Sequence, residues 1–523
     1  MSDDLRASLP DPAPRPLPVT GSPDAASSGS FRAAFSSGTR LRTEVLAGLV
    51  VALALIPEAI AFSIIAGVDP RIGLFAAFTM AVTISFVGGR PAMISAATGA
   101  VALVIAPVMR DHGLDHLVAT VILGGVIQVV LGLLGVAKLM RFVPRSVMTG
   151  FVNALAILIF TSQLPHLFGD KITPDNRWWV YTLVAAGLAI IVLLPRWTKV
   201  VPAPLVAIVL ITGAVLLGGL DVPTVGDEGE LPQSLPTLFF PDVPLTLETL
   251  RTIAPYALAM ALVGILESLM TAKLVDDITD THSNKTRESW GQGVANIVTG
   301  FFGGMGGCAM IGQTMINVKA SGARTRLSTF LAGTFLLALV VGLGDVVATI
   351  PMAALVAVMI MVSVGTFDWH SARPSTLRRM PKSETAVMLA TVAVTVATHN
   401  LAYGVIVGVV VAAVLFLRRV AHLTTVTRLD ASDEDDERVY AVDGELFFAS
   451  SNDLVYQFDY AGDPRRVVVD MSRTHVWDAS TVAALDAVQH KYAQHGKTVE
   501  FRGLDADSAE RLARLAGTLG AGH

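Results

Sequence analysis

The chain has 523 residues, of which 53% are apolar and only 15% carry a charge. A soluble protein of ordinary composition has about 25% charged residues, so these numbers exclude a purely soluble enzyme and a disordered chain. The net charge of −5 leaves no basic stripe for phosphates, which excludes a nucleic-acid binder. A single cysteine, Cys308, excludes a disulfide framework and a cysteine-based zinc cluster.

The N-terminal segment, residues 1–40, is rich in Pro, Ser and Ala and holds no apolar run. Such a segment cannot bury enough apolar surface to fold by itself. We therefore expect a disordered cytoplasmic tail over residues 1–40, and no secretory signal peptide.

Residues 41–420 form a series of apolar runs, and a membrane-spanning helix needs about 20 such residues. Two further runs, residues 94–109 and 309–318, are shorter, are interrupted by small residues and follow Gly-rich segments. Together they predict fourteen transmembrane segments. The twelve full-length candidates begin near Thr43, Arg71, Leu117, Pro144, Trp178, Pro202, Arg251, Arg287, Arg324, Val346, Glu384 and Ala402.

The loop charges favour fourteen crossings over twelve. With a cytoplasmic N-terminus and fourteen crossings, most Lys and Arg residues between spans fall on the cytoplasmic side, as the positive-inside rule requires. Omitting the two short runs swaps the intervening loops and weakens this bias. We expect a multi-pass protein of the inner or plasma membrane with both termini in the cytoplasm.

Fourteen segments divide into two inverted copies of seven, and the sequence carries a trace of this repeat. Gly88-Gly89 precedes Ala92-Met93-Ile94, and Gly303-Gly304 precedes Ala309-Met310-Ile311. Short segments interrupted by glycine at corresponding positions of two halves indicate a transporter binding site.

The composition changes after the last span. An acidic linker is expected over residues 421–437, and residues 438–523 read as a small cytoplasmic α/β domain. Its predicted strands cover residues 467–469 and 498–501, and its predicted helices cover 479–494 and 508–519.

Two acidic residues lie in the middle of predicted spans, Glu58 in the first and Glu267 in the eighth. A charged side chain at mid-membrane is costly and commonly functional, so both are candidates for binding a coupling ion or proton. Thr271 lies one turn after Glu267 on the same helix face and is the third candidate. The alternatives are a protonated glutamate in a helix interface and a threonine bonded within its own helix.

The two short segments suggest an anion site. A helix that begins inside the bilayer presents unpaired N–H groups and a partial positive charge, so two such starts facing each other attract an anion. We expect no metal site, since the acidic and histidine residues at 111–116 lie in a short outer loop, and no ATP-binding motif is present. The predicted substrate-binding residues are Ala97, Thr98, Gly99, Ala309, Met310 and Ile311. Buried amides at Gln128, Asn153, Asn296 and Asn317 are expected to bond between helices.

Several motifs resemble the SulP anion transporter family. They are Ile56-Pro57-Glu58-Ala59 in the first span, Gly150-Phe151 with Asn153-Ala154, and Gly291-Gln292-Gly293 with Asn296. In the C-terminal domain, Gly444–Ala449 and Asp470-Met471-Ser472 followed by Asp478 are similar to STAS domains. The resemblance implies a core domain and a gate domain built from the inverted repeat, a homodimer, and an elevator-like movement of the core.

Within that family the sequence is most similar to sodium-dependent bicarbonate transporters. This resemblance implies that Glu267 and Thr271 correspond to an acidic residue and a threonine that help to bind sodium there. Two positions depart from the pattern: Ile311 replaces a pocket threonine and Gln313 replaces a nearby arginine. In the STAS domain, Ala479 occupies the position where phosphorylated relatives carry serine, with Ser480 one place later.

The sequence therefore predicts a secondary active transporter of small inorganic anions, bicarbonate or sulfate, coupled to sodium or protons and not an enzyme. The expected partners are the anion, the lipid bilayer and a cytoplasmic protein that binds the STAS domain, with Na⁺ as a candidate coupling ion and no other cofactor. A proton-coupled dicarboxylate transporter, and a membrane sensor that signals through the STAS domain with little transport, are the alternatives.

Overall fold

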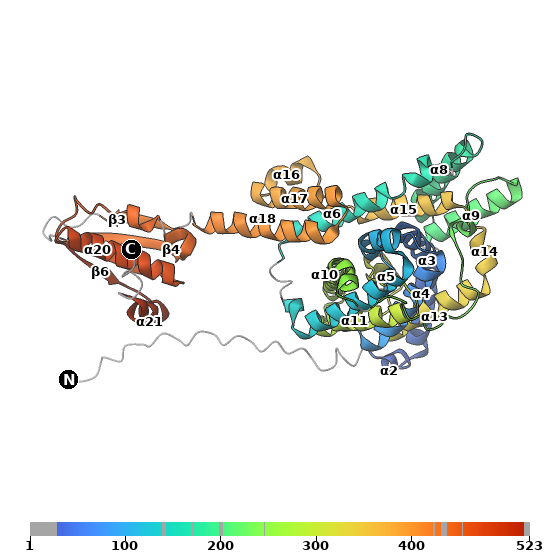
Figure 1. Cartoon of the computed structure of the whole chain (residues 1–523), viewed down its shortest axis with the longest axis horizontal. Helices are drawn as coiled ribbons and strands as arrows, with labels where there is room; N and C mark the ends of the chain where they lie inside the picture. Colours follow the sequence, from blue (N-terminus) through green and yellow to red (C-terminus); the bar gives the residue numbers. More distant parts are fainter. Residues whose placement is uncertain are drawn as a thin grey trace, which may run out of the picture. The chain divides into compact units, whose positions relative to one another are not determined.

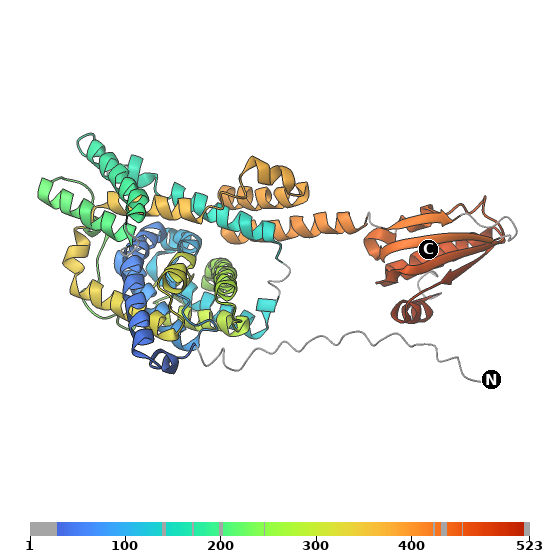
Figure 2. The same ribbon diagram turned by 180° about the vertical axis from the view of Figure 1, so that it is seen from behind.

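The computed structural model describes residues 29–138, 143–169, 172–197, 202–244, 246–421, 424–429, 437–451 and 453–516. The chain forms two compact units, one of membrane-type helices and one that contains the C-terminal α/β domain. Figures 1 and 2 show the helices and strands from opposite sides.

The helical unit begins with α2 (Phe31–Ala34), α3 (Gly38–Ala66), α4 (Pro70–Val87), the short strand β1 (Ser95–Ala96) and α5 (Gly99–Leu133). Local sequence explains where α3 and α4 meet. Gly67 ends α3 in the left-handed conformation with φ 77°, and Pro70 occupies the first turn of α4. Gly113 breaks α5 at φ 82° and ψ −175°, between the two spans that the sequence predicts there.

The next helices are α6 (Arg145–Thr161), α7 (Pro165–Phe168), α8 (Arg177–Leu193), α9 (Ala203–Gly218) and α10 (Leu247–Thr279). They are followed by α11 (Lys285–Phe301), the short strand β2 (Cys308–Ala309) and α12 (Ile311–Met315), which continues directly into a π-helical turn, Ile316–Ala320. The chain then forms α13 (Arg326–Gly342), α14 (Gly344–Ala348), α15 (Met352–Thr366), α16 (Pro374–Arg379), α17 (Lys382–Thr398) and α18 (Leu401–Ala421).

The helices of the first unit pack as two groups. One group contains α3, α4, α5, α10, α11, α12 and α13, and the other contains α6, α8, α9 and α15 (Figures 1 and 2). The first group corresponds to the core that the family resemblance implies, and the second group contains part of the implied gate. Their shared apolar core includes Leu55, Ile60 and Phe62 of α3 and Leu355 and Met359 of α15.

Within the described ranges, seven helices are both long enough and apolar enough to cross a membrane, and α9, α13 and α15 are shorter apolar helices. Every predicted span coincides with a helix or half-helix of the structure. The α-helical membrane fold is confirmed, whereas the count of fourteen crossings and the inverted repeat stay predictions.

The C-terminal domain is a four-stranded sheet in the order β3-β4-β5-β6. Its strands are β3 (Thr425–Leu429), β4 (Glu437–Leu446), β5 (Arg466–Val476) and β6 (Thr498–Arg502), and its helices are α19 (Phe448–Ser451), α20 (Ala479–Gln494) and α21 (Ala506–Leu515). The strands β4, β5 and β6 run parallel to one another, while β3 is antiparallel to β4. Val467, Val469, Leu485, Val488 and Tyr492 form its core.

Two predicted boundaries are wrong. The composition predicts a disordered tail up to residue 40, but residues 31–34 form α2 and residues 38–40 begin α3, because the ring of Phe31 packs against Phe86 and Phe330. The composition predicts an acidic linker over residues 421–437, but residues 425–429 form β3, since this β-branched stretch pairs with β4. The acidic run at 433–436, residues 1–28 of the predicted tail and the end of the predicted helix 508–519 lie outside the described residues.

Candidate functional site

The two short segments meet in space as a two-stranded antiparallel pair. Ser95 lies opposite Ala309, and Ala96 lies opposite Cys308. A side chain at Gly307 would place its Cβ 1.9 Å from the carbonyl oxygen of Ala96, so the close approach requires glycine there.

Buried polar side chains hold this strand pair in place. The Asn296 amide accepts from the Gly307 N–H at 2.8 Å and donates to its carbonyl oxygen at 3.0 Å, while the Ser268 hydroxyl accepts from the Ala309 N–H at 3.1 Å. Gln292 donates to the Ser95 hydroxyl at 2.7 Å. The pair is therefore anchored to α10 and α11 by side chains far from it in sequence.

Each strand leads directly into a helix, β1 into α5 and β2 into α12. The residues before these helices, Thr98 and Met310, make no side-chain hydrogen bond that caps the helix start. The first N–H groups of both helices are therefore left for another partner. Both helix starts lie on one cavity of about 420 Å³, which Thr98, Gly99, Met310 and Ile311 help to line.

The same cavity contains both predicted carboxylates. Glu267 of α10 is only 7% exposed, and its Oε2 accepts a hydrogen bond from the Cys308 thiol at 3.0 Å. The sulfur of Cys308 also lies 3.1 Å from the hydroxyl of Thr98. Glu58 of α3 is hydrogen-bonded to the side chain of Gln313, which belongs to α12. Each carboxylate is thus linked to one of the two helix starts.

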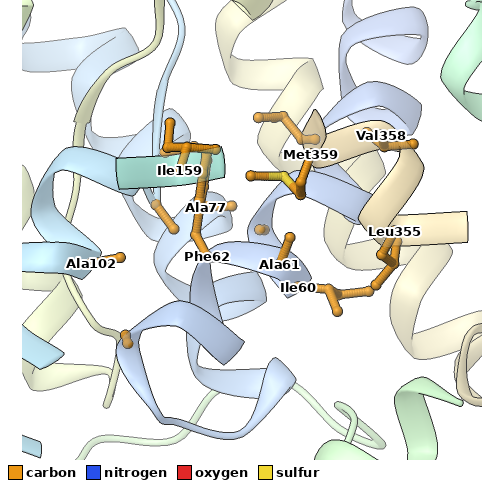
Figure 3. Packing of buried hydrophobic residues seen from close by; sticks show 14 of the residues in the cluster. Ile60, Ala61, Phe62, Ala77, Ala102, Ile159, Leu355, Val358 and Met359 are labelled. Atoms are coloured by element: carbon orange, nitrogen blue, oxygen red, sulfur yellow. The ribbon is translucent and has the colours of Figure 1, made fainter. Parts of the chain in front are cut away.

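The opposite wall of the cavity is almost wholly apolar. Phe151, Val152, Leu155 and Ile159 of α6 and Val362, Gly365 and Thr366 of α15 line it. Figure 3 shows how close these groups of helices lie, with Ile60 and Phe62 of α3 packed between Ile159 of α6 and Leu355 of α15. Polar groups of the cavity therefore come mainly from one group of helices, α3, α5, α10 and α12.

The structure brings six of the nine predicted site residues to the cavity: Glu58, Thr98, Gly99, Glu267, Met310 and Ile311. Ala97, Ala309 and Thr271 are fully buried and are not among its lining residues. The Thr271 hydroxyl donates to the backbone carbonyl of Glu267 at 2.8 Å, which is the arrangement within one helix that the sequence left open. Ala309 instead pairs with Ser95 in the two-stranded sheet.

Sequence reasoning missed much of the lining. Phe62 lies inside the first-span motif, and the only signal at Gln313 is its departure from the family pattern. The residues of α6 and α15 carry no polar signal that would mark them as a binding wall. The predicted interhelical bonds are confirmed for Asn296 with Gln128 (2.8 Å) and for Asn317 with Ser328 (3.0 Å). Asn153 instead bonds to Ser371 (2.9 Å) in the turn between α15 and α16.

The chemistry of the cavity combines partial positive charge with acidic side chains. None of the described lining residues is Lys, Arg or His, so an anion would meet helix N–H groups, the hydroxyls of Thr98 and Thr366 and the amide of Gln313 as donors. Within the described ranges, no three His, Cys, Asp or Glu residues gather in a way that would hold a metal ion.

Comparisons with known proteins agree with this geometry. Residues 41–391 match the model of the sulfate permease family, and residues 428–517 match that of the STAS domain. Bacillus subtilis YbaR, named as a candidate sulfate transporter, is 52% identical over 476 residues, which cover 91% of this chain and 97% of YbaR. The bicarbonate transporter BicA of Synechocystis sp. is 27% identical over 486 residues, which cover 85% of each chain.

Two solved structures share the fold. The transmembrane domain of a cyanobacterial bicarbonate transporter, BicA, matches with a TM-score of 0.62 and 26% identity, covering 71% of this chain and 97% of that one. The murine anion transporter Slc26a9 in its inward-facing state matches with a TM-score of 0.79 and 17% identity, covering 99% and 94%.

The helical unit, the paired short segments and these matches lead to one assignment. Proteins of this group are membrane transporters of anions and not enzymes. The chain belongs to the sulfate permease family and carries a C-terminal STAS domain.

Proposed function

We propose that the chain is a proton-coupled symporter of a small inorganic anion, sulfate or bicarbonate. The anion binds between the starts of α5 and α12, and Glu267 carries the coupled proton. The names of the relatives supply the two anions: YbaR is named for sulfate and BicA for bicarbonate.

One observation carries the proposal: two carboxylates and two uncapped helix starts share a cavity that no described cationic side chain lines. Two unit charges of like sign 4 Å apart repel by about 4 kcal/mol at an effective dielectric constant of 20. An ionised Glu267 therefore opposes entry of an anion, and a proton on Glu267 removes that repulsion. Anion and proton then enter the cavity together.

The surroundings of Glu267 favour a proton over sodium as the coupling ion. Its Oε2 accepts from a thiol, which is a hydrogen-bond donor and a poor ligand for a hard cation. The Thr271 hydroxyl is bonded to its own helix, and Ile311 supplies no oxygen. We infer that Glu267 exchanges protons with the substrate pathway.

The distribution of polar groups supports an elevator-like movement. Glu58, Thr98, Glu267 and Gln313 all belong to the core group of helices, whereas α6 and α15 present a mainly apolar face. The core can therefore carry the bound anion past the gate without exchanging its ligands. Cytoplasmic termini and a homodimer complete the proposal on the basis of the loop charges and the family.

The test is uptake of labelled sulfate into proteoliposomes that contain the full chain. Sulfate does not change its protonation over the neutral range, so an imposed proton gradient acts on the protein alone. We expect uptake driven by an inward proton gradient and unaffected by an inward sodium gradient at constant pH. Uptake that follows sodium and ignores the proton gradient would contradict the proposal.

Two parallel measurements address the alternatives. The first measures uptake of bicarbonate and of fumarate at fixed pH, with sodium or potassium outside. It separates an inorganic-anion carrier from a dicarboxylate carrier. Equilibrium binding of labelled sulfate without any flux would identify a sensor. Glu248→Gln, on an exposed position of α10, is the matched control for substitutions of Glu267.

A further inference from the structure

The thiol of Cys308 lies between the proposed proton carrier and the proposed anion ligand. It donates to Glu267 Oε2 at 3.0 Å, and its sulfur lies 3.1 Å from Thr98 Oγ1. Cys308 is fully buried and Thr98 is 2% exposed, so bulk water does not compete for these bonds. The Thr98 hydroxyl is also free of any capping role at the start of α5.

Glu267, Cys308 and Thr98 form a hydrogen-bonded row, and each member has few protons to donate. An ionised carboxylate only accepts, a thiol has one proton, and a threonine hydroxyl has one proton and two lone pairs. When Glu267 is ionised, the Cys308 proton is used on the carboxylate. The contact between sulfur and Thr98 then requires the hydroxyl proton of Thr98, so Thr98 has no proton left for an anion.

Protonation of Glu267 reverses the direction of the row. The new O–H of Glu267 donates to the sulfur, the thiol donates to Thr98 Oγ1, and the hydroxyl proton of Thr98 is released toward the cavity. Apart from the proton that binds to Glu267, only the thiol proton of Cys308 and the hydroxyl proton of Thr98 need to rotate. An anion that accepts from Thr98 in turn favours the protonated state of Glu267, because coupling between two bound species is reciprocal.

We propose that Cys308 is a positioning residue that couples protonation of Glu267 to the hydrogen-bond donor that Thr98 offers the anion. This inference deepens the proposed function and rests on it. It adds a means by which proton binding raises the affinity for the anion, in addition to the removal of charge repulsion.

Other ionisable groups near the row are engaged elsewhere. Glu58 of α3, which lines the same cavity, is bonded to Gln313 of α12. On α11, Glu288 accepts from the backbone N–H groups of Gly89 and Arg90. Lys273, the next charged residue along α10, is exposed. Measurements in a Glu58→Gln background therefore isolate the contribution of Glu267.

Infrared spectroscopy of the full chain tests the reversal directly. The chain has one cysteine, so its S–H stretching band belongs to Cys308 and disappears in Cys308→Ser. A thiol that donates to a carboxylate absorbs at lower frequency than one that donates to a hydroxyl. We expect the band to move to higher frequency on acidification and, at fixed pH, on addition of sulfate. A band that responds to neither overturns the proposal.

Transport kinetics supply a second test. In the Glu58→Gln background we expect the KM for sulfate to rise at least about fivefold from acidic to alkaline pH. Cys308→Ala is expected to keep its kcat at acidic pH within about twofold and to reduce the pH dependence of KM to the part that charge repulsion from Glu267 supplies by itself. Cys308→Ser, which again donates and accepts, is expected to restore it.

The outcomes separate the two proposals. A wild-type chain that ignores the proton gradient contradicts the proposed function, whatever the variants do. A proton-driven chain in which Cys308→Ala keeps the wild-type pH dependence of KM overturns the role of Cys308 alone. If Cys308→Ala does not fold, comparing Thr98→Ser with Thr98→Val tests the role of Cys308 instead. Only the serine variant keeps the hydroxyl, so only this variant should keep the full pH dependence of KM.

Discussion

Glu267 in the helical unit and Asp463 in the STAS domain are both buried carboxylates, 7% and 4% exposed, but their partners differ. Asp463 accepts from the hydroxyls of Tyr440 at 2.9 Å and Tyr492 at 2.6 Å, and lies 3.7 Å from Arg438 Nε. Glu267 accepts from one thiol and borders a cavity.

The difference separates a structural carboxylate from a functional one. Asp463 connects β4 to α20 through two tyrosine hydroxyls, which are stronger hydrogen-bond donors than a thiol. A thiol is a weak donor, so Glu267 keeps capacity for a proton, and its neighbours are the helix starts that face the cavity. Burial by itself does not mark a site, whereas incomplete bonding beside a cavity does.

The largest expected effect belongs to Glu267. Glu267→Gln keeps the size of the side chain but cannot carry a proton, so proton-driven sulfate uptake should fall by about 100-fold, which is about 2.7 kcal/mol. Glu58→Gln should keep uptake within a few-fold, because the amide can still bond to Gln313. Equal losses in the two variants, measured against Glu248→Gln, would show that Glu267 has no special role.

The second-largest effect is expected from disrupting the strand pair that holds Cys308 beside Glu267. Gly307→Ala forces a Cβ to within 1.9 Å of the Ala96 carbonyl, whereas an added Cβ at Gly312 meets nothing within 4 Å. We expect Gly307→Ala to lower stability by about 3 kcal/mol and to abolish uptake. Gly312→Ala should fold normally. Thermal melting of the detergent-solubilised chain checks both, and an unchanged melting temperature in Gly307→Ala would contradict the close packing.

Substitution of Asp463 should lower the stability of the STAS domain, whereas substitution of Glu267 should lower transport. Asp463→Asn weakens the bonds from both tyrosines and leaves the buried side of Arg438 without a counter-charge, which should cost about 2 kcal/mol of STAS-domain stability. Asp507→Asn, at an exposed position of α21, is the control. Limited proteolysis of the full chain measures the change. Faster cleavage within residues 437–516 is expected, and equal rates in both variants would remove the structural role.

The smallest expected effect concerns alkaline pH. Burial and the neighbouring Asp463 carboxylate raise the pKa of Tyr492, and burial raises the pKa of Tyr460 to about 12. An unfolded chain ionises its tyrosines near pH 10, so the stabilisation is complete below about pH 10 and is lost as the pH rises through the folded values.

Tyr492→Phe should therefore lower STAS-domain stability by about 1 kcal/mol at neutral pH, and the difference from wild type should shrink above about pH 10. Proteolysis rates at pH 8 and above pH 10 provide the comparison. A difference that grows with pH would mean that the Tyr492 hydroxyl is not held in its neutral form by the fold.

The sequence by itself determined the class of protein, the apolar helices, the two short segments and the STAS domain, because hydropathy and glycine patterns are local properties. It also singled out Glu58, Glu267 and Thr98, since charged and small polar residues are conspicuous in apolar runs. Local patterns failed for α2 and β3, whose structure depends on contacts with Phe86, Phe330 and β4.

Only the tertiary structure decided how these residues are joined. The register of Ala96 opposite Cys308, the bond from Cys308 to Glu267 and the contact with Thr98 link positions up to 212 residues apart, as in the pairing of Ala96 with Cys308. The apolar wall from α6 and α15 carries no signal in the sequence, because its residues resemble any others that face lipid or core. Pairing across such distances depends on how whole helices pack, which is why the partners of the two carboxylates appear only in the folded chain.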